Sequence, residues 1–312
     1  MSLASDQLRS GDTRALSRAI SAVENQAPGS VELLKELFPY SGRALTIGIT
    51  GSPGAGKSTL VDQLARQYRR ENRTIGIIAI DPTSAFSGGA ILGDRIRMQE
   101  HFSDPGIYIR SMATRGALGG LARATANVSL VLDACGRDLV LIETVGVGQD
   151  EVDIIRLADM TVVMLVPGMG DDVQSIKAGI MEIADIFVIN KSDHEGAERV
   201  EREIRALQSL AARGEWIPPV VKTTATSGAG VSELRAVIGD FETHLQKPGL
   251  LLDRRARNWE LRLIEMLRDN LLDKAREVIP EPELARLARE IAQHLRDPYS
   301  VIEQVTEKVS RS

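Results

Sequence analysis

The sequence predicts an α/β fold with a doubly wound, mainly parallel sheet, flanked by helical segments at both ends. Two observations support this fold class. Short apolar runs rich in β-branched residues alternate with amphipathic helical stretches between residues 43 and 246, and several of these runs are apolar almost throughout. A parallel strand buried on both faces requires such a run, and strand–helix alternation is typical of a doubly wound sheet.

Seven runs are predicted to form the strands of this sheet. Each is short and mostly apolar, and helical stretches or turn residues separate it from the next. The runs lie at Leu45–Thr50, Thr74–Ile80, Ile107–Ile109, Leu139–Glu143, Thr161–Val166, Ile186–Asn190 and Ile217–Val221.

The segments on either side of the sheet are predicted to be helical. In residues 1–42, apolar side chains recur at the three-to-four spacing of a helix until Ser41 and Gly42 break the pattern. Pro248 and Gly249 belong to a second break, after which the chain is again helical and charged. We therefore predict an N-terminal helical segment (1–42), an α/β domain (43–246) and a C-terminal helical arm (247–312).

The composition excludes several classes of function. The 312 residues carry a net charge of −5 with a pI of about 5.6, whereas nucleic-acid binding needs a clustered positive field. No apolar run reaches the length of a membrane span, and the first residues lack the apolar core of a signal peptide. Cys135 is the single cysteine, so no internal disulfide can form. We expect a cytoplasmic protein that binds neither nucleic acid nor membrane.

A glycine-rich turn directly after the first predicted strand matches the phosphate-binding pattern GxxxxGK[ST] at every fixed position. Glycines let the backbone curl around phosphates, and the following helix adds the partial positive charge of its N-terminus. Lys57 brings a full charge to the outer phosphates, and the Ser58 hydroxyl can ligate Mg²⁺. A chance glycine-rich turn is the alternative. The predicted phosphate-binding residues are Gly51, Ser52, Pro53, Gly54, Ala55, Gly56, Lys57, Ser58 and Thr59.

An Asn-Lys-Ser-Asp sequence that ends at Asp193 follows an apolar strand and points to guanine as the base. An ionised carboxylate only accepts hydrogen bonds, and guanine presents two adjacent donors, its N1–H and its 2-amino group. Adenine offers no such pair. A polar surface turn is the alternative. A short loop is predicted to back the base, although Thr226 stands where lysine is frequent. The predicted base-binding residues are Asn190, Lys191, Asp193, Thr224, Ala225 and Thr226.

Two carboxylates at the ends of apolar strands are predicted to hold Mg²⁺. Asp81 and Glu143 each follow or end such a strand, and ligands bind at the carboxyl edge of this kind of sheet. Mg²⁺ prefers oxygen ligands and keeps several waters, so one or two carboxylates plus phosphate oxygens suffice. The alternative is that both residues only begin helices, where acidic side chains are also favoured.

Seven motifs follow one another along the chain, at Gly51–Ser58, Asp81–Ser84, Gly88–Asp94, Leu118–Gly120, Glu143–Gln149, Pro167–Asp172 and Gly179–Glu182. In this order they resemble the MeaB/ArgK family, the methylmalonyl-CoA mutase-associated GTPases. That family belongs to the same P-loop GTPase group as the nickel- and zinc-insertion chaperones. The resemblance covers about residues 5–245, and Glu143 stands where most GTPases carry aspartate.

The resemblance implies a function and partners. Members of this family hydrolyse GTP and act as chaperones for adenosylcobalamin-dependent acyl-CoA mutases, gating delivery of the cofactor and protecting or rescuing the mutase. They are usually homodimers held partly by the C-terminal arm. The family's switch regions map onto Asp81–Arg97, Glu143–Val152 and Gly168–Gly179.

The resemblance also adds residues to the expected site. Asp94 would join the two carboxylates around Mg²⁺, and Lys177 and Asp171 would respond to the nucleotide state and to the partner. Arg97 is a candidate charge stabiliser, with an ion-paired surface arginine as the alternative. The candidate catalytic residues are Lys57, Asp94, Arg97, Glu143 and Lys177, and the candidate metal ligands are Ser58, Asp81, Asp94 and Glu143.

Slow intrinsic turnover is predicted, because no glutamine directly follows Gly146 to orient the attacking water. Gln149 stands three residues further on and is equally well explained as a solvated loop residue. A partner that orders the switch regions is expected to accelerate hydrolysis. Ser111–Arg115 replaces a serine- and proline-rich run of some members, which bears on the choice of client mutase.

Three alternatives to a mutase chaperone stay open. A metal-insertion chaperone would need clustered Cys and His ligands, whereas Cys135 is alone and the four histidines are scattered along the sequence. A P-loop kinase for a small metabolite would need neither the guanine motif nor the helical arms. A non-catalytic scaffold would not need Lys57, Ser58, Asp81 and Glu143 intact.

Overall fold

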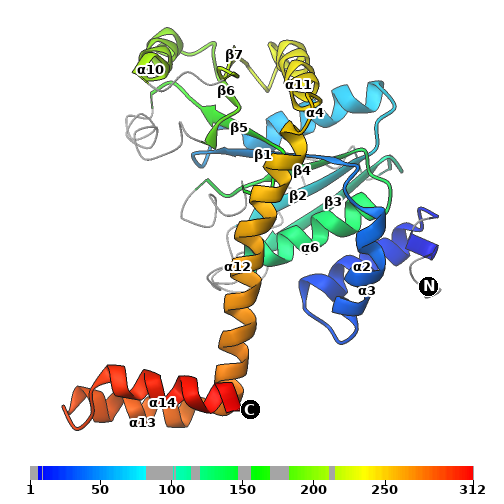
Figure 1. Ribbon diagram of the computed structural model, residues 1–312. Helices are drawn as coiled ribbons and strands as arrows, with labels where there is room; N and C mark the ends of the chain where they lie inside the picture. The colour runs from blue at the N-terminus through cyan, green and yellow to red at the C-terminus, as the bar shows by residue number, and fades with distance from the viewer. Residues whose placement is uncertain are drawn as a thin grey trace. The chain divides into compact units, whose positions relative to one another are not determined.

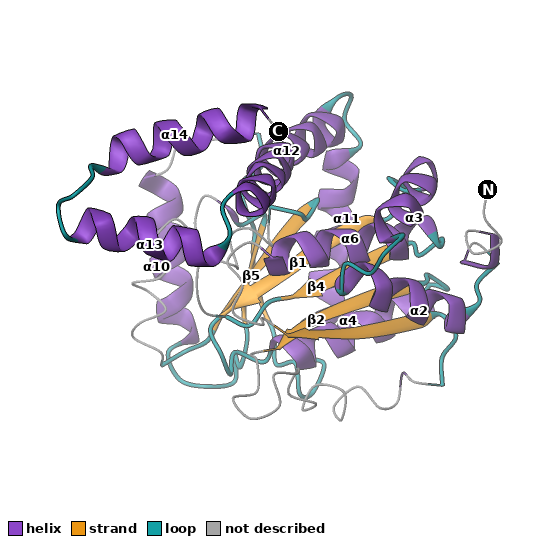
Figure 2. Ribbon diagram, turned by 90° about the horizontal axis from the view of Figure 1, so that it is seen from below, coloured by secondary structure: helices purple, strands orange, loops and turns teal. Residues whose placement is uncertain are grey.

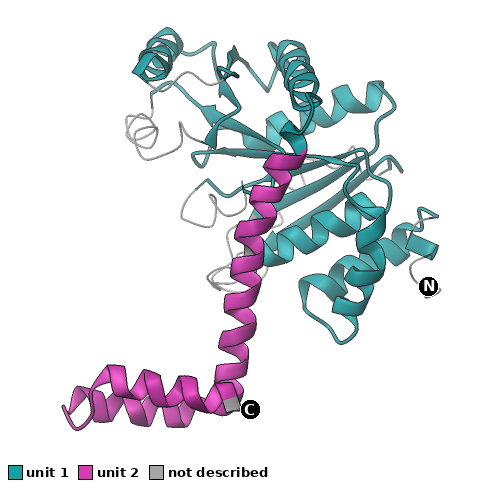
Figure 3. Cartoon of the chain, viewed as in Figure 1, with its two compact units in different colours: residues 1–251 teal, residues 252–312 magenta. Residues whose placement is uncertain are grey.

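The computed structural model describes residues 6–8, 10–81, 101, 103–113, 120–146, 156–168, 183–210 and 215–311. The chain forms two compact units, Met1–Leu251 and Leu252–Ser312, which Figure 3 shows in different colours. The phosphate-binding and base-binding motifs of the sequence all lie in the first unit.

One parallel sheet organises the first unit. In the described part of the chain it has seven strands in the order β3-β2-β4-β1-β5-β6-β7, and each neighbouring pair is parallel. Because the chain builds the sheet outward on both sides of β1, the sheet is doubly wound and the predicted fold class is confirmed. The strands are β1 (Leu45–Gly51), β2 (Ile75–Asp81), β3 (Ile107–Ala113), β4 (Leu139–Glu143), β5 (Met160–Leu165), β6 (Ile186–Ile189) and β7 (Val220–Lys222).

Two strand boundaries differ from the prediction by more than one residue. β3 continues to Ala113 instead of ending at Ile109, because its polar residue Arg110 is paired: the guanidinium Nε donates to the Glu24 carboxylate at 2.8 Å. β7 begins at Val220 instead of Ile217, since the two prolines between these positions have no N–H to donate to a neighbouring strand.

Helices cover both faces of the sheet (Figure 1, Figure 2). Side chains of β4 alternate between two apolar clusters: Leu139 and Leu141 belong to one, and Val140 and Ile142 belong to the other. The first cluster includes α4 (Lys57–Arg70) and α11 (Val231–Leu245). The second includes α2 (Thr13–Glu24), α3 (Ser30–Leu37) and α6 (Gly120–Ala134), and a third packs α10 (Ala197–Leu210) on β5 and β6.

The N-terminal helices form because their ends and their apolar faces are both satisfied. Asp12 caps α2 by accepting hydrogen bonds from the N–H groups of Arg14 and Ala15, at 2.8 and 3.0 Å. Leu16, Ile20 and their neighbours recur on one face and are buried in the second cluster. This segment therefore shares its core with the sheet.

Aspartates fix the starts of the strands. Asp138, Asp159 and Asp185 each accept a backbone N–H from the beginning of a neighbouring strand region, from Thr74, Thr46 and Thr161 at 2.7, 3.0 and 2.8 Å. These N–H groups have no strand partner at the edge of a sheet, so the carboxylates satisfy them. The acidic residues of this amino edge are thus structural, and the carboxyl edge holds the predicted site.

The second unit is helical, and α12 (Leu250–Val278) leads into it. In the described residues its buried core consists of Ile279, Leu287 and Val301, which join α13 (Glu281–Ala292) and α14 (Pro298–Arg311). None of the described helices combines the length and the apolar character that a bilayer crossing demands.

Candidate functional site

The predicted phosphate-binding loop connects β1 to α4 at the carboxyl edge of the sheet. β1 lies between β4 and β5, so the chain segments that follow these strands flank the loop. In a doubly wound sheet this is the crevice where ligands bind, beside the N-terminus of a helix whose dipole favours anions.

Two glycines of the loop are required by close packing as well as by their backbone angles. Gly51 has φ +143°, and a Cβ there would lie 2.2 Å from the main-chain oxygen of Met164. Gly56 has φ +93° at the N-cap of α4, and a Cβ there would lie 2.5 Å from Asn190 Nδ2. Side chains at either position would push the loop away from its neighbours.

Lys57 and Ser58 link the loop to the segment after β4. Lys57 Nζ donates to the main-chain oxygens of Gly51, Ser52 and Val145, at 2.7, 3.1 and 3.2 Å. Ser58 Oγ donates to Glu143 Oε1 at 2.6 Å, and all three side chains, those of Lys57, Ser58 and Glu143, are buried. The structure therefore brings together a lysine, a hydroxyl and a carboxylate that the sequence assigned to one site.

Asn190 ties the phosphate-binding loop to the predicted base loop. Its Nδ2 donates to the main-chain oxygen of Ala55 at 2.7 Å. Its Oδ1 accepts from Thr223 Oγ1 and from the Ala225 N–H, both at 3.0 Å. The side chain is 3% exposed, so these bonds satisfy it inside the protein.

Asp193 and the base loop lie next to each other. Thr224 Oγ1 donates to Asp193 Oδ1 at 3.2 Å, while the Asp193 side chain stays 58% exposed. Lys191 adopts φ +54°, which turns the chain between the buried Asn190 and the exposed carboxylate. Thr226 is exposed on the same loop.

Comparison with known proteins identifies this arrangement. Residues 16–279 match the family model described as methylmalonyl Co-A mutase-associated GTPase MeaB. The chain belongs to the MeaB family. GTPase ArgK of Escherichia coli is 38% identical over 254 residues, 78% of this chain and 77% of that protein.

Two further relatives match more of the chain. A protein of Pyrococcus abyssi that is named as a GTPase is 46% identical over 308 residues, 97% of this chain and 95% of its own. The mouse protein named methylmalonic aciduria type A homolog, mitochondrial, is 35% identical over 282 residues, which make up 84% of this chain and 68% of the mouse protein. This MeaB-family chain is thus a GTPase with GTP and GDP as its nucleotides, as the sequence predicted.

A solved structure agrees with the fold. The crystal structure described as LAO/AO transport system kinase superposes with a TM-score of 0.73 at 28% identity, over 98% of this chain and 96% of that one. The prediction of a P-loop GTPase fold and the resemblance to MeaB/ArgK are therefore both confirmed.

Several predicted site residues of the MeaB-family chain lie outside the described residues. They are Asp94, Arg97, Asp171 and Lys177, together with Gln149 and most of the three switch regions. Asp81 ends β2, and only its backbone is described. Among the described residues no group of three or more His, Cys, Asp or Glu side chains is placed to hold a metal ion.

Two buried polar contacts near the loop had no signal in the sequence. Thr144 Oγ1 donates to Thr50 Oγ1 at 3.1 Å, beside the loop. One helical turn after Ser58, Asp62 Oδ1 lies 2.6 Å from His101 Nε2, and its other oxygen accepts from Arg66 at 3.0 Å. Burial raises the pKa of Asp62, but these hydrogen bonds outweigh burial and hold the pKa below its ordinary value. Because the partners in these two contacts lie far apart in sequence, no spacing of nearby residues could have predicted them.

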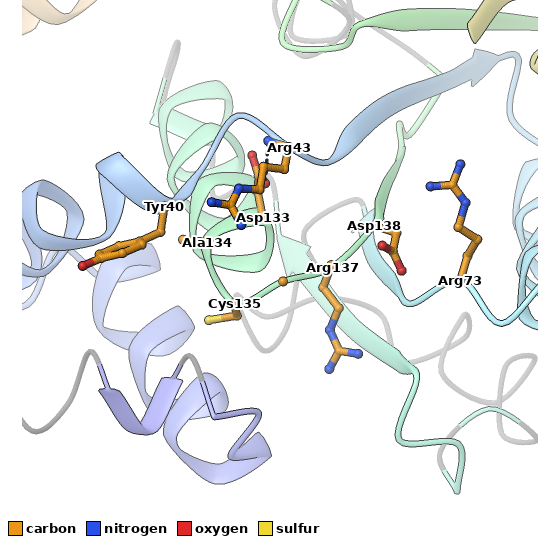
Figure 4. Close-up of a pocket in the computed structure, with 9 residues that line it drawn as sticks. Tyr40, Arg43, Arg73, Asp133, Ala134, Cys135, Arg137 and Asp138 are labelled. Carbon is orange, nitrogen blue, oxygen red and sulfur yellow. Dashed lines mark hydrogen bonds between the residues drawn. The ribbon is translucent and has the colours of Figure 1, made fainter. Parts of the chain in front are cut away.

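A pocket of about 460 Å³ lies at the opposite, amino edge of the sheet (Figure 4). Three arginines line it, but Arg73 pairs with Glu242 at 3.6 Å and Arg137 donates to the Pro105 oxygen at 3.2 Å. Figure 4 shows the guanidinium groups of Arg73 and Arg137 pointing in different directions. Their charges do not converge on one ligand, and none of the predicted nucleotide-binding residues lines this pocket.

Proposed function

We propose that this MeaB-family GTPase works with Mg²⁺ as a chaperone for an adenosylcobalamin-dependent acyl-CoA mutase of the methylmalonyl-CoA mutase type. It gates delivery of the cofactor to the mutase, and it protects or reactivates that enzyme. The match of residues 16–279 to a family described as methylmalonyl-CoA mutase-associated carries the proposal. The mouse relative named for methylmalonic aciduria type A supports it.

The loop Gly51–Ser58 is proposed to hold the phosphates. Bonds to three main-chain oxygens keep Lys57 Nζ against this loop, where the outer phosphates of GTP would lie. Water attacks the γ-phosphorus, and the bond to the β–γ bridging oxygen breaks to give GDP and phosphate. Lys57 stabilises the charge that develops on the oxygens around the breaking bond.

Ser58 and Glu143 are proposed as ligands of Mg²⁺, with Asp81 and Asp94 as the further carboxylates of the site. The hydroxyl and the carboxylate oxygen, 2.6 Å apart, are both hard oxygen donors of the kind that Mg²⁺ prefers. The ion supplies positive charge to the β- and γ-phosphate oxygens when it is bound. Arg97 and Lys177 are proposed to add to this charge and to the response of the switch regions.

Asp193 is proposed to select guanine by accepting its N1–H and its 2-amino group. The Thr224 hydroxyl holds one carboxylate oxygen at 3.2 Å, and the exposed position of the carboxylate leaves it accessible to a base. Asn190, Lys191, Ala225 and Thr226 complete the proposed base site.

A homodimer held partly by the C-terminal arm is also proposed. Helix α12 has no buried side chain in its 29 residues, although it carries many leucines. Leu263, Ile264 and Leu267 are each 60% exposed. Such a set of exposed apolar side chains on one helix suits burial against a second copy.

Binding to the client tests the proposed role. The full chain is immobilised with GDP or with a non-hydrolysable GTP analogue and exposed to purified methylmalonyl-, isobutyryl- and 2-hydroxyisobutyryl-CoA mutase subunits. We expect one of them to bind with a nucleotide-dependent affinity and to raise GTP turnover at least about tenfold. Absence of binding in both nucleotide states, with GTP hydrolysis intact, would remove the mutase from the proposal and leave the GTPase.

The same preparation separates the rival functions. A small-molecule kinase would yield a phosphorylated metabolite, whereas a GTPase releases inorganic phosphate in equal amount to GDP. A metal-insertion chaperone would bind Ni²⁺ or Zn²⁺ stoichiometrically, which equilibrium dialysis measures. A scaffold would retain GTP without hydrolysis.

A further inference from the structure

We propose that the buried hydroxyl pair Thr50 and Thr144 is a positioning pair, which holds the Glu143–Gly146 segment against the phosphate-binding loop and thereby sets the affinity of the site for Mg²⁺. This inference rests on the proposed Mg²⁺ role of Ser58 and Glu143. Neither threonine is proposed to touch nucleotide or metal.

The pair sits where two strands part. β1 and β4 are in register up to Ile49 and Glu143, and Thr50 and Thr144 are the next residues of each chain segment. Beyond this point β1 continues to pair with β5, through Thr50 and Val163, while the segment after β4 leaves the sheet. The Thr144 N–H still donates to the Ile49 oxygen at 3.1 Å. The hydrogen bond between the two threonine hydroxyls thus joins the two chain segments at the position where the segment after β4 leaves the sheet.

The two threonines close a ring of contacts around the site. Thr144 lies between Glu143, which accepts from Ser58, and Val145, whose oxygen accepts from Lys57. On the other strand, Thr50 precedes Gly51, whose oxygen also accepts from Lys57. A shift of Thr144 would therefore move both of its neighbours relative to α4, and the Ser58–Glu143 distance of 2.6 Å would change with them.

Because both threonines are buried, water cannot easily substitute for the hydrogen bond between them. Thr144 is 1% exposed and Thr50 is 3% exposed, so water cannot replace a lost partner without entering the core. Threonine is branched at Cβ and has few side-chain rotamers, which fixes the direction of its hydroxyl. Valine keeps the shape of threonine and removes only the hydroxyl, so it separates a hydrogen-bonding role from a packing role.

The test uses Thr144→Val, Thr50→Val, the double variant and the conservative Thr144→Ser in the full chain. Thr125→Val is the matched control, because Thr125 is equally buried but lies on α6, where its hydroxyl donates to Met112 Sδ at 4.0 Å. Half-saturating Mg²⁺ for GTP hydrolysis and the affinity for GDP in EDTA are measured for each protein.

We expect each valine variant to raise the half-saturating Mg²⁺ concentration about tenfold, equivalent to about 1.4 kcal/mol, with GDP affinity in EDTA changed less than about twofold. Thr144→Ser and Thr125→Val should resemble the parent. The double variant should need no more Mg²⁺ for half-saturation than either single variant, because each single substitution already removes the Thr50–Thr144 hydrogen bond.

An unchanged Mg²⁺ requirement in the valine variants would overturn the inference, and so would additive effects in the double variant. If Thr144→Val does not fold, the Mg²⁺ requirement of Thr50→Val tests the inference. If neither variant folds, the pair serves only the stability of the fold, and the inference is overturned. Failure of the proposed function looks different, since the parent protein itself would then show no Mg²⁺-dependent hydrolysis of GTP.

Discussion

The side-chain amide of Asn190 donates a hydrogen bond to the main-chain oxygen of Ala55 at 2.7 Å. This contact connects the loop after β1 with the loop after β6, which are the two proposed binding regions for phosphate and base. The Asn190 oxygen is held in turn by Thr223 and Ala225. One buried side chain therefore fixes the spacing of the two loops.

Replacing Asn190 by Ala should weaken binding of both GTP and GDP about 10- to 100-fold. Three buried groups lose their partner, and leaving such groups unsatisfied costs about 1–3 kcal/mol each before the loops relax. Fluorescent analogues of both nucleotides measure the affinities. Ser192→Ala on the same turn is the control, because Ser192 Oγ shares only a 3.3 Å contact with Thr224. Equal losses in the two variants would contradict this role of Asn190.

The glycines of the phosphate-binding loop give a second prediction. Gly54 and Gly56 both have positive φ, at +77° and +93°, but only at Gly56 does an added Cβ meet a neighbour, Asn190 Nδ2 at 2.5 Å. Gly54→Ala should lower the free energy of unfolding by about 1–2 kcal/mol through backbone strain alone. Gly56→Ala should cost at least about 1 kcal/mol more, because Asn190 must move.

Chemical denaturation of the nucleotide-free protein compares the two glycine variants directly. Because both substitutions add the same methyl group at positive φ, the difference between them isolates the contact with Asn190. A Gly54→Ala variant that is as unstable as Gly56→Ala would show that the contact is not what requires glycine.

Local patterns explain why the sheet and the phosphate-binding loop could be predicted from sequence. β4 and β5 are buried on both faces, so every residue of Leu139–Ile142 had to be apolar, and such runs stand out. The loop obeys fixed spacing because Lys57 and Ser58 must open a helix. The predicted strand ended before the charged residue Arg110, but β3 continues through it. The ion-pair partner of Arg110, Glu24, is distant in sequence, so the apolar pattern could not indicate this.

Other parts of the site had no sequence signal. Asn190 was predicted as a base-binding residue from its place in the Asn-Lys-Ser-Asp sequence, but its hydrogen bonds to Ala55, Thr223 and Ala225, which join the two loops, had no signal in the sequence. The Asp62–His101 contact joins residues 39 positions apart and depends on where the chain returns to α4. Tertiary contacts of this kind follow from the fold, and no residue spacing encodes them.

Asp193→Asn should exchange the preferred base. An amide presents one donor and one acceptor, which suits xanthine with its N1–H and its 2-oxo group, and leaves the guanine 2-amino group facing a donor. We expect the affinity for GTP to fall about 100-fold or more and xanthosine triphosphate to support hydrolysis in its place. Competition between the two nucleotides measures the change. Unaltered preference for GTP would place the base elsewhere.

The Asp62 carboxyl predicts a pH dependence of stability. Its pKa is below the ordinary 3.8 in the folded protein, so its stabilising effect is present above the ordinary value and is lost as the pH falls through the folded value. Asp62→Asn should therefore lower the midpoint of thermal unfolding at about pH 7. The difference in midpoint between the variant and the parent should become smaller below about pH 4. Asp240→Asn, at an exposed position of α11, is the control. A difference in midpoint that is constant over this range would mean that the charge of Asp62 contributes nothing.

The final prediction concerns the C-terminal arm. Leu263 and Leu267 lie one turn apart on α12 and are each 60% exposed. If a second copy covers them, Leu263→Asp together with Leu267→Asp would bury two charges in an apolar interface, and the dissociation constant of the homodimer should rise at least about 100-fold. Light scattering coupled to size exclusion measures the mass in solution.

Arg276→Glu adds a negative charge to the same helix at a position that is already polar and 70% exposed, so it should leave the dimer intact. Basal GTP hydrolysis should persist in the double aspartate variant, because neither leucine is among the proposed site residues. A parent chain that stays monomeric at micromolar concentration would remove the dimer from the proposal. A double variant that stays dimeric would instead locate the interface away from these leucines, since an interface that buried two unpaired carboxylates could not hold at this concentration.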